Sequence, residues 1–148
     1  MTALGSLVRV HSWTLDEKRQ KLVGLEELAG KMDEDLERLE AELNSEQRAA
    51  AGSIEGTIAF PAFVAAALER RKKLRESIAS LGLAIAAARA EVREAFQEVK
   101  KYQLARDNYE RREREKVARR EQRELDELGA NMHRRKKAAG GDGGDGGA

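Results

Sequence analysis

The side chains most capable of chemistry in this chain are His11, His133 and the carboxylates of residues 33–37. Imidazoles and paired carboxylates serve as metal ligands or as general acids and bases once a third ligand or a pocket completes the site. The two histidines lie near opposite ends of the chain, and the sequence offers no third ligand to join them. The carboxylates project around a helix rather than into a cleft. We therefore expect no metal site, no cofactor and no enzymatic activity.

Other catalytic devices are missing from the sequence as well. The 148 residues include no cysteine, which excludes a thiol nucleophile, a cysteine–zinc site and disulfide bonds, and suits a reducing compartment. The glycine-containing stretch at residues 52–56 has no lysine, so it does not match a phosphate-binding loop. No apolar run reaches the length of about 18 residues that a membrane span needs, and the N-terminal residues do not resemble a secretory signal. These observations predict a cytoplasmic chain.

The composition favours long helices over a broad globular core. Charged residues make up 37% of the chain and aromatic residues only 4%, so few bulky side chains are available to fill a wide interior. Alanine, leucine, glutamate, lysine and arginine are abundant, and these strong helix formers are typical of coiled coils. The length suits one domain. We therefore predict an all-α fold.

A first heptad seam predicts a helix over residues 4–50. Apolar residues recur at alternating steps of three and four, which is the spacing of the a and d positions of a coiled coil. The seam consists of Leu4, Val8, His11, Leu15, Lys18, Leu22, Leu25, Ala29, Met32, Leu36, Leu39 and Leu43. A capping-box pattern at Thr14 to Glu17 would instead begin a helix at residue 15. The seam passes through this point in register, which favours the longer helix.

A turn and a second helix follow. Residues 52–60 include two glycines, and Pro61 disfavours helical angles at Phe60 while suiting the first position of a helix. We therefore predict a turn at residues 52–60 and a helix over residues 61–133. Its seam, again at steps of four and three, consists of Leu74, Ile78, Leu81, Ile85, Ala88, Val92, Ala95, Val99, Tyr102, Arg106 and Tyr109.

Two such helices joined by one turn predict an antiparallel coiled-coil hairpin, which forms a domain over residues 1–137. The expected neighbours across the seam are Leu36 with Ile78, Ala29 with Ile85, Leu22 with Val92 and Leu15 with Val99. An intermolecular coiled coil is the alternative, because β-branched seam residues are also compatible with parallel dimers. Residues 138–148 are dominated by glycine, and we predict that they form a disordered tail.

Charge is segregated along the chain, although the net charge is only +1. Residues 15–46 carry 5 basic and 11 acidic side chains, whereas residues 100–137 carry 14 basic and 8 acidic ones. In the predicted hairpin the first helix is too short to cover this basic segment. Ion pairs such as Glu110–Arg114 and Glu115–Arg119 would support a lone helix. Lone helices are marginal in water, however, which favours an external partner for the segment.

Several motifs together resemble the flagellar export protein FliJ family, especially its alphaproteobacterial forms. They are Leu-Asp-Glu-Lys-Arg-Gln at residues 15–20, Ile-Ala-Phe-Pro-Ala-Phe at 58–63, Arg-Glu-Ala-Phe-Gln-Glu-Val-Lys-Lys-Tyr at 93–102, Glu-Arg-Arg-Glu-Arg-Glu at 110–115 and Glu-Leu-Asp-Glu at 124–127. The resemblance covers residues 4–137. It implies an antiparallel two-helix coiled coil, similar to the central stalk of rotary ATPases, in the flagellar type III export apparatus.

The resemblance also implies a role and a set of partners. In that role the chain would be a central stalk and general chaperone that couples the export ATPase to the export gate. The partners would be that ATPase and its regulator, the gate membrane protein and export chaperones, with the chain peripheral to the cytoplasmic side of the inner membrane. The candidates for ATPase binding are Arg112, Lys116, Arg119, Arg120 and Arg123. The candidates for gate binding, near the turn, are Phe60, Phe63, Leu68, Arg71 and Arg75.

Two other functions remain open on the residues alone. The chain could be a structural coiled-coil adaptor, or its basic helix could bind nucleic acid by neutralising phosphates. Acidic residues interleave with basic ones throughout residues 106–128, and the pattern of aromatic residues among basic ones that suits base stacking is missing. We therefore expect no nucleic acid among the partners.

Overall fold

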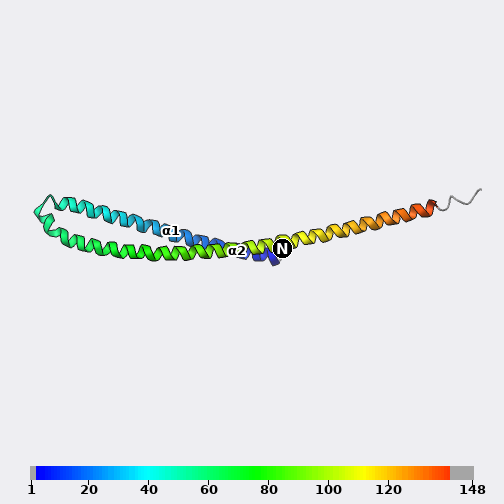
Figure 1. The fold of residues 1–148 in the computed structure, drawn as a ribbon, viewed down its shortest axis with the longest axis horizontal. Helices are drawn as coiled ribbons and strands as arrows, with labels where there is room; N and C mark the ends of the chain where they lie inside the picture. The colour runs from blue at the N-terminus through cyan, green and yellow to red at the C-terminus, as the bar shows by residue number, and fades with distance from the viewer. Residues whose placement is uncertain (1–2, 141–148) are drawn as a thin grey trace, which may run out of the picture. The chain divides into compact units, whose positions relative to one another are not determined.

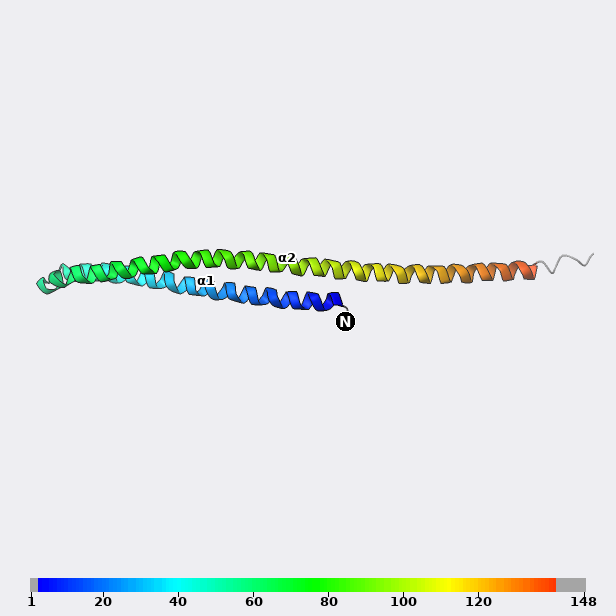
Figure 2. The same ribbon diagram turned by 90° about the horizontal axis from the view of Figure 1, so that it is seen from below.

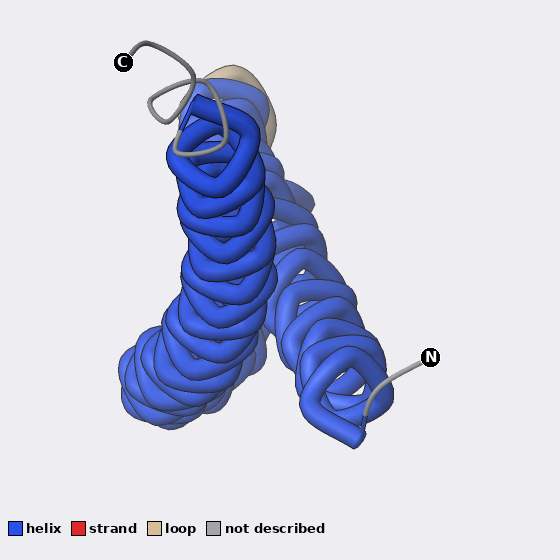
Figure 3. Tube along the Cα trace, turned by 90° about the vertical axis from the view of Figure 1, so that its right-hand side faces the viewer, coloured by secondary structure: helices blue, strands red, loops and turns tan. Residues whose placement is uncertain are grey.

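The structure is a computed structural model that describes residues 3–140 of the chain. Its described part consists of two helices, α1 (Ala3–Ala50) and α2 (Ile54–Gly140), and the turn between them, which is the tan segment in Figure 3. The predicted all-α fold is thus confirmed. The chain divides into two compact units, Met1–Lys101 and Tyr102–Ala148, which we call the hairpin unit and the C-terminal unit. This division differs from the single domain expected over residues 1–137.

The hairpin unit is built on the predicted seam. α1 and the first part of α2 lie side by side in both Figure 1 and Figure 2, with the turn at one end. Within this unit every seam residue of both helices is buried or half-buried, and Ala88 is the most enclosed at 2% exposed. No large side chain of residues 3–101 is fully enclosed, because two helices can cover only the stripe between them. Packing along one narrow seam therefore holds the antiparallel hairpin together.

Ion pairs between the helices agree with the predicted register. Arg89 contacts Glu26 and Arg75 contacts Glu40, each at 3.4 Å between guanidinium nitrogen and carboxylate oxygen. Lys18, the charged member of the first seam, reaches Glu91 at 3.4 Å. Exposed pairs such as these contribute at most about 1 kcal/mol each. Their effect is mainly on register, because sliding one helix along the other would break several of them together.

The turn between the helices is shorter than predicted. α2 begins at Ile54, so the prediction of a turn over residues 52–60 and a helix start at Pro61 is wrong. Ser53 is the physical reason, since its Oγ accepts a hydrogen bond from the backbone N–H of Gly56 at 2.9 Å and caps the helix. Pro61 lies inside α2, where it cannot donate to the carbonyl of Thr57.

The first turn of α2 packs closely against the end of α1. The hydroxyl of Thr57 donates to the carbonyl of Ala50 at 2.9 Å, which satisfies one of the last acceptors of α1. A Cβ added at Gly56 would lie 3.0 Å from the Cα of Ala50 and 2.7 Å from the Oγ of Ser53. Gly56 is therefore required for this close approach. In the sequence this glycine indicated an interruption of the helix, whereas in the structure it allows α2 to begin at Ile54.

Three further boundaries follow from the helices. α1 runs through Thr14, whose hydroxyl donates to the carbonyl of Val10 at 3.2 Å, so the alternative helix start at residue 15 is wrong. α2 continues past the predicted end at residue 133 and includes residues 138–140 of the predicted tail. Residues 141–148 of that tail lie outside the described part of the chain.

Replacing Ile85 by Asp is expected to unfold the hairpin. The half-buried seam position would hold an unpaired carboxylate, at a cost of more than about 2 kcal/mol. Circular dichroism should show a loss of helix and a lower melting temperature. The control is Leu83→Asp on the same helix, since Leu83 is 76% exposed. Equal melting temperatures for the two variants would contradict the seam.

The ion pairs of Glu91 predict a dependence of stability on pH. The hydrogen bond from Lys21 and the charges of Lys18 and Lys21 lower the pKa of Glu91 below its ordinary value. A lowered pKa adds stability above the unfolded-state pKa, and this stability is lost as the pH falls through the folded-state pKa. The melting temperature of Glu91→Gln should therefore be lower than that of the parent chain at pH 7 and approach it near pH 3. A constant difference across this range would contradict the assignment.

Candidate functional site

Among residues 3–140, no three His, Cys, Asp or Glu side chains gather closely enough to hold a metal ion. Neither helix has an apolar stretch long enough to cross a membrane. Surface features remain in both units, and they contain residues singled out from the sequence.

The first surface lies at the turn of the hairpin unit. A cavity of about 270 Å³ opens there between the end of α1 and the start of α2. Phe60 and Phe63 line it together with the small residues Ala49, Ala50, Ser53, Gly56 and Ala59 and with Glu46. The small residues leave room beside the two aromatic rings. An apolar side chain of a binding partner would fit this cavity, because its wall contains one charged group only.

The five residues predicted for gate binding do not form one patch. Phe60 and Phe63 share the cavity, whereas Leu68 is an exposed residue on a later turn of α2. Arg71 is half-buried, since it continues the seam three residues before Leu74. Arg75 is engaged with Glu40 of α1. The prediction therefore combines two residues that face a common cavity with three that lie elsewhere along the hairpin.

Two exposed isoleucines at the turn were not predicted. Ile54 and Ile58 are 82% and 75% exposed and lie one helical turn apart. Ile58 lies within residues 56–68, a stretch that includes no charged side chain, and Ile54 shortly precedes this stretch. A helix that is apolar on all sides is normally buried, so the exposed side of this stretch is a candidate for contact with another protein. The lack of charge is visible in the sequence, but interpreting residues 52–60 as a turn concealed it.

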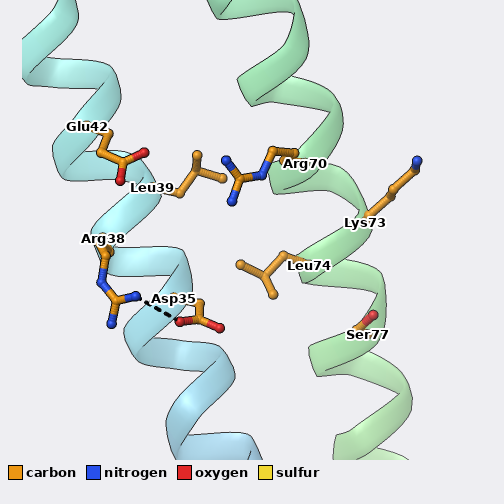
Figure 4. A pocket seen from close by; sticks show the side chains of 8 residues that line it. All are labelled: Asp35, Arg38, Leu39, Glu42, Arg70, Lys73, Leu74 and Ser77. Atoms are coloured by element: carbon orange, nitrogen blue, oxygen red, sulfur yellow. Dashed lines mark hydrogen bonds and ion pairs between the residues drawn. The ribbon is translucent and has the colours of Figure 1, made fainter.

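A groove with mixed charge lies farther along the hairpin (Figure 4). It measures about 410 Å³ and is lined by Asp35, Arg38, Leu39, Glu42, Arg70, Lys73, Leu74 and Ser77. Leu39 and Leu74 point toward each other across the seam, while Arg70 extends toward α1 and Lys73 away from it. Arg38 is paired with Asp35 at 3.3 Å. Acidic residues of α1 thus border the basic cluster of residues 70–75.

The second surface is a basic face of the C-terminal unit. All five residues predicted for ATPase binding are exposed, and they are Arg112, Lys116, Arg119, Arg120 and Arg123. At about 100° of rotation per residue, they fall within an arc of about 100° on one side of α2. From Glu110 to Gly140, every side chain except that of Glu113 is exposed. The structure therefore brings this predicted set together on one accessible helix face.

Few local interactions engage this basic face. Lys116 contacts Glu113 at 3.2 Å, but neither Glu110–Arg114 nor Glu115–Arg119, the ion pairs expected from the sequence, forms within residues 102–140. Gln122 donates instead to Asp126 at 3.1 Å. The guanidinium groups of Arg119, Arg120 and Arg123 therefore remain available to acidic groups of another molecule.

Comparison with known proteins gives one finding. A family model described as "Flagellar FliJ protein" matches residues 1–138 of the chain. No curated protein and no solved structure matches it. The match includes α1, the turn and nearly all of α2, and so it contains both candidate surfaces.

Proposed function

This chain belongs to the FliJ family of flagellar proteins and is a component of the flagellar export apparatus, and on that premise we propose its specific role. We propose that it acts as a central stalk and general chaperone that couples the export ATPase to the export gate. The exposed basic face of the C-terminal unit carries this proposal, because residues chosen for ATPase binding from the sequence prove to share one side of a helix. The protein works at the cytoplasmic side of the inner membrane, bound there through its protein partners.

Electrostatics supports the ATPase as the partner of the basic face. Arginine forms bidentate hydrogen bonds with carboxylates, and a row of them on one face suits an acidic surface that runs along the helix. Exposed charges retain their hydration in such a contact, so the expected attraction is moderate and sensitive to salt. A moderate attraction suits a stalk that must move against its surroundings, since deep apolar anchoring would fix it in place.

The turn surface supports a different kind of contact for the gate. Its cavity beside Phe60 and Phe63 and its exposed residues Ile54 and Ile58 offer apolar burial rather than charge. Apolar and aromatic anchors in small pockets typically dominate binding energy at protein interfaces. The regulator of the ATPase and the export chaperones are further partners, for which we assign no surface. α2 carries both the turn surface and the basic face, so one helix links the two proposed contacts.

A structural adaptor is the main alternative, and turnover distinguishes it. Purified export ATPase should change its rate of ATP hydrolysis, or its assembly into rings, when this chain is added in stoichiometric amounts. An adaptor without a coupling role would bind without either effect. The rate should be measured at low and at moderate salt, because an electrostatic contact weakens as ionic strength rises.

Reversing charge on the basic face is expected to weaken ATPase binding. The variant Arg119→Glu with Arg123→Glu should bind the export ATPase at least about tenfold more weakly, because two attractive contacts become repulsive. Helix content should not change, since both residues are exposed. The matched control is Arg111→Glu with Arg114→Glu, which makes the same change of charge on another side of the helix. Equal loss of binding in both variants would remove the basic face from the proposal.

Changing the turn surface is expected to weaken binding to the cytoplasmic part of the gate protein. Ile58→Asp removes an exposed apolar contact, and Phe63→Ala enlarges the cavity at the turn. Each change should raise the dissociation constant by about tenfold, which corresponds to the loss of one apolar side chain from an interface. Leu83→Asp again serves as the control on an exposed position of α2. Binding that survives both changes would place the gate contact elsewhere.

A further inference from the structure

Burial along α1 is uneven. The buried side chains of this helix are Val8, Leu15, Leu39 and Ala50, so none lies between residues 15 and 39. The seam residues of the middle of the helix are only half-buried, and they are Leu22, Leu25, Ala29, Met32 and Leu36. We call residues 22–36 the middle segment of α1. A segment with few buried apolar side chains opens at a lower free energy than the rest of a structure.

Two glycines lie in this middle segment, although no contact requires them. A Cβ added at Gly24 or at Gly30 would meet nothing within 4 Å beyond the local backbone of its own helix. Glycine lowers the stability of a helix interior relative to alanine, because it has more conformational freedom to lose on folding. Both glycines therefore weaken α1 in the same segment in which its burial is lowest.

The space between the helices is incompletely filled beside Met32. An open hollow of about 620 Å³ lies there, and the small side chains of Ser77, Ser80 and Ala84 form part of its α2 wall. Small side chains offer few atoms for dispersion contacts, so this methionine gains less from packing than a fully surrounded core residue does. The hollow thus marks a second reason why the middle segment is weakly held.

Ion pairs between the helices give this part of the hairpin little additional support. The exposed pair Glu26–Arg89 is followed along α1 by Glu40–Arg75, and residues 27–39 form no ion pair with α2. An exposed pair contributes little to stability. The seam alone therefore joins the helices over most of the middle segment.

We propose that the middle segment of α1 opens locally from α2 while the turn and the N-terminal part of α1 stay packed. Opening exposes Leu81 and Ala88, which are buried on α2, so the open form is a minor state. Leu15 and Leu39 hold α1 on either side of the segment, and the hairpin can therefore bend at this point without unfolding. The proposal does not depend on the proposed function, because it concerns the free chain and needs no other protein.

Amide hydrogen exchange of the full chain tests the proposal. After correction for intrinsic rates, the amides of residues 24–36 should be protected at least about tenfold less than those of residues 10–18 and 40–46, because local opening precedes global unfolding. Protection that is uniform from residue 10 to residue 46 would overturn the proposal.

Replacing the glycines tests the cause of the opening. Gly24→Ala with Gly30→Ala should raise the protection of residues 24–36 at least about tenfold, since each alanine favours the closed helix. The matched control is Gly82→Ala on α2, where an added Cβ also meets nothing within 4 Å. The control should leave the protection of residues 24–36 unchanged, because α2 stays helical when α1 opens. An equal rise in both variants would mean that the two helices open as one unit, and would contradict the proposal.

The dependence of exchange on urea distinguishes local opening from global unfolding. A local opening exposes little surface, so the protection of residues 24–36 should change little at low urea concentration. Protection of the residues around Leu15 and Leu39 should fall more steeply, since their exchange requires a larger opening. Equal slopes in all three regions would show that the hairpin unfolds as a whole, and would overturn the proposal.

Discussion

The structure depends on one constraint, which is that neither helix can bury its apolar stripe alone. A single helix in water is marginal, and most helical stability comes from packing one face against a partner. The turn at Ser53 supplies that partner within the same chain, so the seams of α1 and α2 cover each other. The outward position of most charged residues in the hairpin unit follows from this seam.

A core of this kind leaves most of the surface available for partners. Because only a narrow stripe is enclosed, the remaining faces can carry charge or apolar residues with little effect on stability. The exposed residues Ile54 and Ile58 illustrate the point, since no folded-state contact explains two isoleucines at 82% and 75% exposure. Selection for binding is the simplest physical account of such residues in a chain that is otherwise rich in charge. The same argument applies to Leu125 and Leu128 in the C-terminal unit.

The seam could be predicted from the sequence because its signal repeats over many turns. Leu15 and Val99, expected as neighbours, are both buried, and the charged seam residue Lys18 finds an acidic partner across the hairpin. The turn could not be predicted as well, because it depends on a few local contacts. Gly56 was interpreted as a helix breaker, whereas its missing side chain lets α2 begin against the end of α1. Pro61 removes one backbone hydrogen bond from α2, yet the helix continues through this residue.

The candidate surfaces, like the seam and the turn, differ in how far the sequence predicts them. Positions set by the helical repeat could be predicted, whereas positions set by a few local contacts could not. The common position of Arg119, Arg120 and Arg123 on one side of a helix could be predicted, because their spacing is helical and the helix itself was predictable. The turn surface could be predicted only in part, since Phe60 and Phe63 share a cavity while Arg71 belongs to the seam. Arg119 and Arg123 lie on the opposite side of the helix from Leu125 and Leu128, so a partner bound to one of these two faces does not by itself cover the other.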